Sequence, residues 1–296
     1  MPSALTPYFD FSDAAVAELA GVDAARALQE DVGADDLTAG LIDASRRTRA
    51  HILVREAAVL CGVPWAQAAL QQLDPTVRLD WQVQEGQPCV ADQVVLEIEG
   101  SARALLTAER TALNFLQLLS AVASKTADYV AAVQSVPGSR AQIVDTRKTL
   151  PGLRLAQKYA VRVGGGSNHR LGLYDAVLIK ENHIAAAGGV AAVLRRAAEL
   201  APAAKFVEIE VENLAQLREA LAAGASLVLL DNMGLAQLQE AVQLNAGRAK
   251  LEVSGGVNLS TVRAIAATGV DRISIGALTK DVKAIDFSMR FAASPL

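Results

Sequence analysis

The second half of the chain repeats one unit, an apolar strand followed by a loop and a helix, and this repeat restricts the folds available to it. The last four expected strands begin about 22 residues apart, at 206–210, 226–231, 250–254 and 272–276. Helices are expected between them at 213–224, 235–245 and 258–269, and the first and third end in glycine, which favours helix termination. Because the spacing equals one βα unit with short loops, it predicts parallel strands.

Two earlier strands, expected at 142–145 and 175–179, bring the number of parallel strands to six. Such strands form either an open doubly wound sheet or a barrel, and the glycines that end the last two units resemble the phosphate site of a barrel. We therefore expect an α/β fold with an incomplete TIM-like barrel of about six or seven parallel strands.

Residues up to about 126 show no regular repeat. Strands expected at 51–62, 77–89 and 94–100 precede one long helix expected over 107–133. Strands in succession before a helix indicate an antiparallel sheet with helices on one side. We expect an N-terminal α/β domain over residues 1–116 and the barrel over 117–284. The amphipathic segment 285–296 is expected outside the barrel, packed back on the N-terminal domain.

The composition argues against several classes of protein. The 296 residues are 52% hydrophobic and 20% charged, an ordinary globular mixture, and the net charge of −4 argues against nucleic-acid binding. No apolar stretch reaches the ~20 residues that a bilayer span requires. The first residues, MPSALTPYFDFSD, lack the basic and apolar regions of a secretion signal. Cys61 and Cys89 match no metal-binding pattern, so we expect a reduced, cytoplasmic protein with no membrane partner.

Polar residues of different kinds follow the expected strands at their carboxyl ends, where parallel sheets and barrels place their sites. In chain order they are Asp145-Thr146-Arg147-Lys148, Lys180, Glu210, Asp231, Ser254-Gly255-Gly256 and Gly276. One polar residue after a strand is commonplace, because strands end in loops. Six successive ends, with cations first, carboxylates next and glycines last, indicate a binding site.

Residues 145–180 are strongly basic, with seven Lys or Arg against two Asp. Three of the seven, Arg154, Lys158 and Arg162, are four residues apart and are expected to form a solvated helix face. The other four are Arg147, Lys148, Arg170 and Lys180. Guanidinium groups pair with carboxylates through two hydrogen bonds, and lysine adds a point charge. Four converging cations would repel one another unless an anion lay between them, so they predict a strongly negative ligand.

The glycine run 164–166 leads directly to His169 and Arg170. Glycines allow backbone N–H groups to approach an anion, although many glycine runs are only flexible turns. His169 could donate a hydrogen bond to the ligand or to a neighbouring residue, whereas His51, at the start of an expected strand, is interpreted as structural.

Glu210 and Asp231 end adjacent strands. Such a pair can act in acid–base catalysis, bind Mg²⁺ or hold ribose hydroxyls, and the cationic surroundings favour Mg²⁺-phosphate with ribose contacts. The pairs Gly255-Gly256 and Gly276-Ala277 are expected to form a phosphate cradle from backbone N–H groups.

The segment DTRKTLPGLRLAQKYAVRVGGGSNHRLGLYDAVLIKENHI (145–184) closely resembles the central motif of the quinolinate phosphoribosyltransferase family, the nicotinate-nucleotide pyrophosphorylases (carboxylating). Further resemblance lies in REAAVLCG (55–62), AERTALNFLQLLSAVASKT (108–126), VEIEVEN (207–213), LLDNM (229–233), LEVSGGV (251–257) and ISIGALTKDVKAIDFSMRF (273–291). The resemblance covers nearly the whole chain. It implies an α/β-sandwich N-terminal domain, a barrel of six or seven strands, and a homodimer or larger assembly whose sites are completed by the neighbouring subunit.

The resemblance also implies roles for individual residues. Arg110, an ordinary helix residue by its sequence pattern, would cross the dimer interface to the quinolinate carboxylates. The cationic pocket for quinolinate and phosphate would contain Thr146, Arg147, Lys148, His169, Arg170 and Lys180. Glu210 and Asp231 would hold ribose and Mg²⁺, directly or through water, and with Lys148 would be the catalytic residues. Ser254, Gly255, Gly256, Ile275, Gly276 and Ala277 would hold the 5′-phosphate.

The implied reaction transfers phosphoribosyl from phosphoribosyl pyrophosphate to quinolinate with decarboxylation, giving nicotinate mononucleotide, pyrophosphate and CO₂. Three alternatives are a relative of the same fold acting on another aromatic acid, a nicotinate phosphoribosyltransferase, and a non-catalytic sensor of phosphate ligands. The full set of cations and the pair Glu210 and Asp231 favour the first interpretation over all three.

Overall fold

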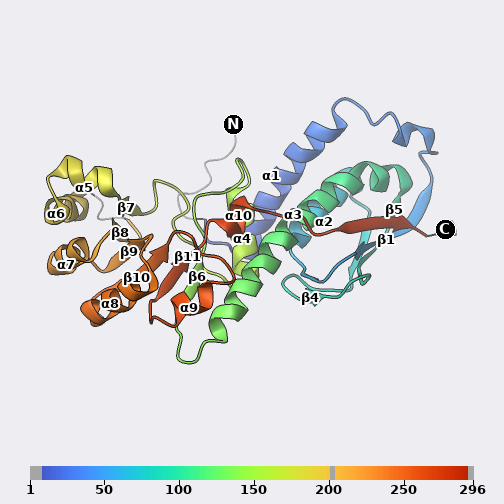
Figure 1. Cartoon of the computed structure of the whole chain (residues 1–296). Helices are drawn as coiled ribbons and strands as arrows, with labels where there is room; N and C mark the ends of the chain where they lie inside the picture. The colour runs from blue at the N-terminus through green and yellow to red at the C-terminus, as the bar shows by residue number, and fades with distance from the viewer. Residues whose placement is uncertain (1–8, 201–203, 293–296) are drawn as a thin grey trace. The chain divides into compact units, whose positions relative to one another are not determined.

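The computed structural model describes residues 9–200 and 204–292, which form two compact units (Figure 1). One unit contains residues 9–125, 151–164 and 282–292, and the other contains residues 126–150 and 165–281. The first eight residues, where the sequence predicts no secretion signal, and the end of the expected C-terminal segment lie outside the described residues.

The first unit is built on an antiparallel sheet of four strands in the order β12-β1-β5-β3. Its strands are β1 (Arg47–Val54), β3 (Arg78–Trp81), β5 (Val94–Ser101) and β12 (Phe287–Phe291). A separate two-stranded sheet pairs β2 (Ala58–Val59) with β4 (Pro88–Cys89). The strand expected at 51–62 is therefore wrong in its bounds, because β1 starts earlier and the chain bends before β2 joins another sheet. His51 lies within β1 rather than at its start.

The helices of the first unit are α1 (Asp13–Val32), α2 (Val63–Leu73), the first part of α3 (Ala102–Gln134) and α4 (Arg154–Val163), with a short 3₁₀ helix at Ala39–Leu41. The core is aliphatic and includes Ile52, Leu96 and Leu105, all fully buried. Trp65 of α2 donates a buried hydrogen bond of 3.0 Å to Asp23 of α1. Glu85 accepts the free N–H groups of Gly62 and Val63 at the start of α2, at 2.9 Å each. Its two bonds fix the start of that helix.

The expectation that Arg154, Lys158 and Arg162 form one solvated face of α4 is wrong for Lys158. Its side chain is fully buried, next to the equally buried Gln157. Arg162 is exposed, and its guanidinium lies 5.0 Å from the centroid of the Phe11 ring. The spacing of four residues placed the three cations on one stripe, but α4 turns the middle of that stripe toward the interior of the unit.

The second unit is an incomplete α/β barrel of six parallel strands, in the order β6-β11-β10-β9-β8-β7. The strands are β6 (Gln142–Val144), β7 (Val177–Ile179), β8 (Val207–Val211), β9 (Leu227–Asp231), β10 (Lys250–Ser254) and β11 (Arg272–Ser274). This confirms the fold class and all six expected strands. β6 and β7 are the two edges of the sheet, so the barrel has an open seam between them.

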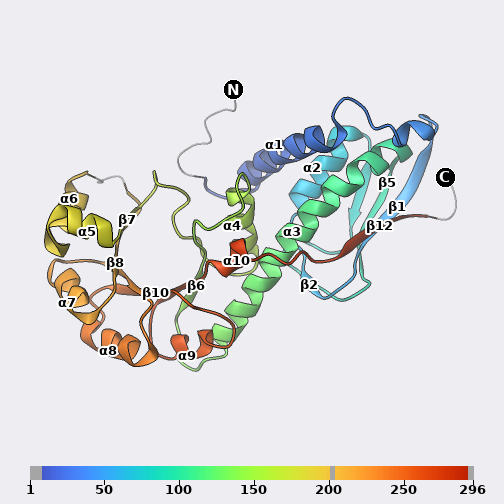
Figure 2. The same cartoon turned by 45° about the horizontal axis from the view of Figure 1, so that its top comes forward.

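Helices α5 (Glu181–Ala187), α6 (Val190–Leu200), α7 (Leu214–Ala222), α8 (Leu235–Asn245) and α9 (Val262–Ala266) lie outside the curved sheet (Figure 2). The short α10 (Ala277–Lys280) follows β11. Helix α9 is shorter than expected, because Asn258 accepts hydrogen bonds from residues 260 and 261 and forms a turn before it. Gly224 and Gly269 have φ of +82° and +94°, which confirms the expected helix termination by glycine.

Side chains alternate along each barrel strand between the helices and the concave face. On β8, Ile209 and Val211 are fully buried beneath the helices, whereas Glu208 and Glu210 point to the concave face. In register, Glu210 pairs with Leu229 of β9 and Leu229 pairs with Glu252 of β10, so these three side chains share that face.

The two compact units do not follow the expected boundary at residues 116 and 117. Residues 117–125 of α3 and residues 151–164 belong to the unit with the antiparallel sheet. Strand β12 pairs antiparallel with β1, with Ile52 opposite Met289, and joins the C-terminal segment to that sheet. Among the helices of residues 9–200 and 204–292, none is both long enough and apolar enough to span a membrane.

Candidate active site

A cavity of about 340 Å³ opens on the concave face of the barrel unit, at the carboxyl ends of its strands. Its lining includes eight of the expected residues: Thr146, Arg147, Lys148, His169, Arg170, Lys180, Glu210 and Ser254. Four further lining residues, Leu178, Leu229, Glu252 and Ser274, were not expected. The lining therefore carries four cations against two carboxylates, an excess of positive charge in a confined space.

The segment after β6 is fixed to the glycine run by one buried carboxylate. Asp145 accepts hydrogen bonds from the backbone N–H of His169 at 2.9 Å and from Nδ2 of Asn168 at 2.6 Å. Lys148 is held by the segment that follows the neighbouring strand β11, since its carbonyl oxygen accepts a bond of 2.8 Å from the hydroxyl of Thr279 in α10. The contacts of Asp145 bring Arg147 and Lys148 close to Arg170, which lies more than 20 residues further along the chain.

Arg147 carries a feature that points to a ligand. Its Nε atom is buried and has no hydrogen-bond partner within the part of the chain that the structure describes. A buried donor without a partner costs free energy on the order of 1–3 kcal/mol. The site therefore gains stability when an acceptor, such as a carboxylate, enters the cavity.

Arg170 is only 9% exposed and is held by its own loop. Its Nη1 donates to the carbonyl of Ala176 at 3.3 Å. The buried carboxylate of Asp175 accepts hydrogen bonds from the N–H groups of Leu171 and Gly172 at 2.9 and 3.2 Å, and these bonds fix the conformation of the loop that follows Arg170. Burial, followed by the charge of Arg147, lowers the pKa of Arg170 from its ordinary value. Both effects disfavour the bare cation and would be relieved by an anion.

Lys180 and Glu210 form a close ion pair within the cavity lining, with Nζ 2.7 Å from Oε2. The position of Lys180 at the start of α5 is fixed by His183. The His183 Nδ1 accepts the N–H of Lys180 at 3.0 Å, and the His183 N–H donates to the Lys180 carbonyl at 2.8 Å.

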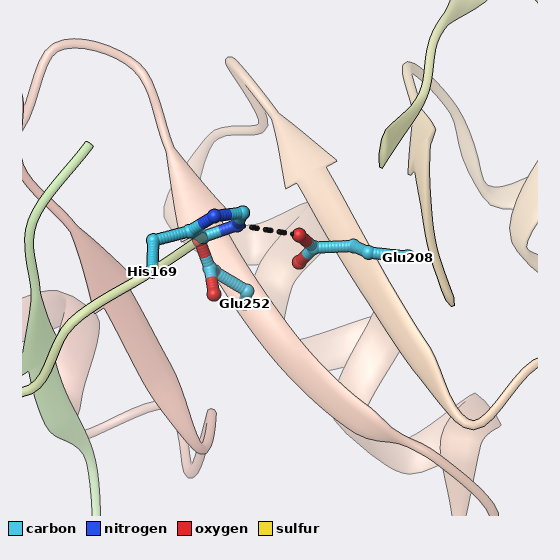
Figure 3. A group of neighbouring side chains, drawn as sticks. All are labelled: His169, Glu208 and Glu252. Carbon is cyan, nitrogen blue, oxygen red and sulfur yellow. Dashed lines mark hydrogen bonds and ion pairs between the residues drawn. The ribbon is translucent and has the colours of Figure 1, made fainter. Parts of the chain in front are cut away.

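Two buried carboxylates that the sequence did not predict, Glu208 and Glu252, lie beside His169 (Figure 3). Glu208 and Glu252 are both fully buried, and His169 lies between them with Nε2 at 2.7 Å from Glu208 and 3.7 Å from Glu252. Arg272 Nε lies 2.9 Å from Glu252, outside hydrogen-bond geometry. The missed signal was the alternation within VEIEV and KLEVS, which places Glu208 and Glu252 two residues before Glu210 and Ser254 on the same face.

Burial raises the pKa of Glu208 to about 7, with Arg272 and Arg170 acting in the opposite direction. Burial, and then the charge of Glu208, raises the pKa of Glu252 to about 7. Two carboxylates this close in the barrel interior favour holding a proton between them near neutral pH.

The remaining expected residues are not part of the cavity lining. Asp231, half-buried at the end of β9, accepts a bond of 2.8 Å from the side chain of Asn232. Gly276 lies against the cavity, because a Cβ there would meet the Lys148 side chain at 3.0 Å. Arg110 is exposed on α3 and belongs to the unit with the antiparallel sheet. Four others follow β10 and β11 outside the lining: Gly255, Gly256, Ile275 and Ala277.

Both halves of the chain match models of one family. Residues 35–120 match the N-terminal domain of quinolinate phosphoribosyl transferase, and residues 122–290 match its C-terminal domain. This chain belongs to the quinolinate phosphoribosyltransferase family.

Individual members of the family are similar to the chain along most of their length. The nicotinate-nucleotide pyrophosphorylase (carboxylating) of Mycobacterium leprae is 44% identical over 274 residues, covering 89% of this chain and 94% of that protein. Quinolinate phosphoribosyltransferase (decarboxylating) 2a of Nicotiana tabacum is 38% identical over 284 residues, covering 89% of this chain and 80% of that protein. The solved nicotinate-nucleotide pyrophosphorylase of Francisella tularensis has a TM-score of 0.89 at 43% identity, covering 93% of this chain and 97% of that chain.

Proposed function

We propose that this chain transfers phosphoribosyl from phosphoribosyl pyrophosphate to quinolinate and releases CO₂, forming nicotinate mononucleotide and pyrophosphate for NAD biosynthesis. The observation that carries the proposal is the cation excess of the cavity, together with the buried Nε of Arg147 that lacks a partner among the described residues. The four cations of the lining outnumber its two carboxylates, and this net positive charge suits a ligand with two carboxylates.

In this proposal Arg147 and Arg170 bind the carboxylates of quinolinate through paired hydrogen bonds. His169 borders the same pocket. Arg110 of a second copy supplies a further cation, so that a homodimer is the smallest assembly with complete sites.

Phosphoribosyl pyrophosphate is assigned to the lysines and the strand ends beside them. Lys148 and Lys180 attract its phosphates, while Glu210 and Asp231 orient the ribose. The 5′-phosphate is assigned to the loops after β10 and β11, which contain Ser254, Gly255, Gly256, Ile275, Gly276 and Ala277. Gly255 and Gly256 have φ of +98° and +62°, a conformation in which backbone N–H groups can turn toward an anion.

Mg²⁺ is the proposed cofactor, and the residues at the strand ends fit it. Glu210 and Asp231 offer the oxygen ligands that Mg²⁺ prefers, and the strand register places both on the concave face. Both side chains could hold the ion directly or through water. When bound with the pyrophosphate, the ion would offset its negative charge.

The chemistry then depends mainly on positioning and electrostatics. The pyridine nitrogen of quinolinate carries no proton and attacks the anomeric carbon of the ribose, while the bond to pyrophosphate breaks and its electrons leave with that group. The ring nitrogen becomes positively charged. Loss of CO₂ from the neighbouring carbon leaves an electron pair that this charge stabilises, and a proton from water completes the product. No general base is required for the attack.

The proposal is tested by incubating the purified chain with quinolinate, phosphoribosyl pyrophosphate and Mg²⁺ and measuring nicotinate mononucleotide and CO₂. Formation of both in equal amounts is expected. Product from nicotinate but not from quinolinate would select the nicotinate enzyme instead, and no product from either acid would contradict the proposal.

The contribution of Arg110 is tested by mixing two inactive variants, Arg110→Ala and Arg147→Ala. If Arg110 acts in the partner's site, a mixed dimer contains one site with both substitutions and one intact site. Random exchange of subunits should then restore about a quarter of the wild-type activity. If Arg110 acts within its own chain, no site in the mixture is intact and no activity returns.

A further inference from the structure

The buried carboxylate of Glu208 contacts His169, a residue of the acceptor pocket, which is the part of the cavity assigned to quinolinate. Glu208 lies on β8 with 0% exposure, and its Oε2 is 2.7 Å from Nε2 of His169 (Figure 3). His169 itself is 7% exposed and borders the cavity. Glu208 is absent from the cavity lining, so any effect it has on a ligand passes through its neighbours.

The hydrogen bonds of His169 determine where its proton resides. The His169 Nδ1 accepts the backbone N–H of Arg170 at 2.7 Å, so Nδ1 carries no proton. The proton of the neutral ring is then on Nε2 and is donated to Glu208. Glu208, His169 and the Arg170 backbone thus form one continuous chain of hydrogen bonds from the barrel interior to the cavity.

We propose that Glu208 is a positioning residue for the acceptor pocket: it holds His169 in the Nε2-protonated form, whose Nδ1 fixes the backbone at Arg170 and thereby the guanidinium that binds the acceptor. The role in acceptor binding rests on the proposed function.

Glu252 is not equivalent to Glu208 in this arrangement. Its nearest oxygen is 3.7 Å from His169 Nε2, beyond hydrogen-bond distance, and its other oxygen pairs with Arg272 at 2.9 Å. The three side chains have ligand atoms within 4.8 Å of one another, a spacing that a metal ion could also use. The proton on Nε2 and the neighbouring Arg272 cation both oppose a metal ion there, so a protein hydrogen bond is the better assignment.

The first test reads the proton position directly in the wild-type chain. Only three histidines are present, so ¹⁵N-labelled imidazoles can be assigned by comparison with His51→Gln and His183→Gln variants. At pH 8 we expect the His169 spectrum of a neutral ring protonated on Nε2. A ring protonated on Nδ1, or on both nitrogens, would overturn the proposal. This measurement needs no substrate and no substitution at Glu208.

The second test separates Glu208 from Glu252. In Glu208→Gln the side-chain oxygen still accepts a hydrogen bond from Nε2 of His169. The position of the His169 proton and most of the affinity for quinolinate should therefore persist. In Glu208→Leu the hydrogen-bond acceptor for His169 Nε2 is lost, and we expect a mixture of His169 rings protonated on Nδ1 and on Nε2. The KM for quinolinate should rise about tenfold, and the KM for phosphoribosyl pyrophosphate should change less. In Glu252→Gln the proton should stay on Nε2.

An unchanged His169 spectrum in Glu208→Leu, or equal increases in both KM values, would overturn the role of Glu208. If Glu208→Leu does not fold, the wild-type spectrum and the Glu208→Gln variant still decide the question. A wild-type chain that fails to convert quinolinate would contradict the proposed function, whereas a different protonation form would contradict only the role of Glu208.

Discussion

Charged side chains occupy the barrel at two depths, and the two groups are balanced in different ways. The rim group lies at the strand ends and lines the cavity: Arg147, Lys148, Arg170, Lys180 and Glu210. The buried group lies one step deeper, although two of its members, His169 and Glu252, also border the cavity. It contains His169, Glu208, Glu252 and Arg272. The rim group has an excess of cations that only a ligand can offset. In the buried group, charges are offset by one another and by bound protons, so that group organises the protein rather than the ligand.

The comparison predicts that the largest loss of activity comes from the rim. In Arg147→Ala a paired contact to a substrate carboxylate is lost, and we expect kcat/KM for quinolinate to decrease about 10²–10³-fold. Thermal stability should change little, because the Nε of Arg147 has no partner among the described residues to lose. Arg196→Ala, on the exposed surface of α6 in the same unit, is the matched control and should retain wild-type kinetics. Near-normal turnover by Arg147→Ala would remove Arg147 from the pocket.

The buried group should instead affect how the free energy of unfolding depends on pH. Because burial raises the pKa of Glu252 to about 7, the folded chain keeps a proton that the unfolded chain releases near the ordinary value of 4.5. The contribution of Glu252 to the free energy of unfolding is therefore present at low pH and is lost as the pH rises to about 7. Glu252→Gln should gain stability relative to wild type between pH 5 and 7, by at most about 1.4 kcal/mol per pH unit.

Denaturant titrations of both proteins at pH 5, 6, 7 and 8 measure this difference. Glu199→Gln removes an exposed carboxylate of α6, whose side chain is 66% exposed, and should run parallel to wild type. If Glu252→Gln also runs parallel to wild type, the carboxylate is ionised throughout and the buried group is balanced by charge alone.

A smaller effect is expected at the glycines beyond the rim. A Cβ at Gly255 would clash with Oδ1 of Asn232, whose Nδ2 donates a hydrogen bond to Asp231. Gly255→Ala should therefore displace Asn232 and raise the KM for phosphoribosyl pyrophosphate a few-fold, in addition to a backbone cost of about 1–2 kcal/mol. Gly256→Ala, at a position with φ of +62° and no atom within 4 Å of its Cβ, controls for a positive φ without the clash. Equal KM values in the two variants would show that Asn232 does not position Asp231.

Local sequence patterns predicted the barrel well, because each βα unit is short and its strand is separated from the next by one amphipathic helix. The six strands β6 to β11 all formed where apolar runs indicated them. Non-local structure was less accessible. The pairing of β12 with β1 joins residues more than 230 positions apart, and no local pattern specifies which edge strand a terminal segment will join.

The rim residues were predictable because strand ends are sites of expected chemistry, and all five line one cavity. The two carboxylates of the buried group were overlooked because Glu208 and Glu252 lie inside apolar strands, where a carboxylate is rare and is readily taken for the polar side of an exposed sheet. Lys158 was misassigned for the converse reason. Helical periodicity shows which residues share a stripe, but it does not show whether that stripe faces solvent.

The chain enters and leaves the barrel unit several times, and this has a consequence for recombination. Arg147 and Lys148 lie in the loop where the chain leaves the unit before residue 151, and His169 and Arg170 lie in the loop where it returns after residue 164. A single crossover between two related genes would therefore separate one part of a compact unit from the rest. Exchange of an intact barrel between homologues requires several simultaneous junctions, so the two halves of the cation set are inherited together with the helix that connects them.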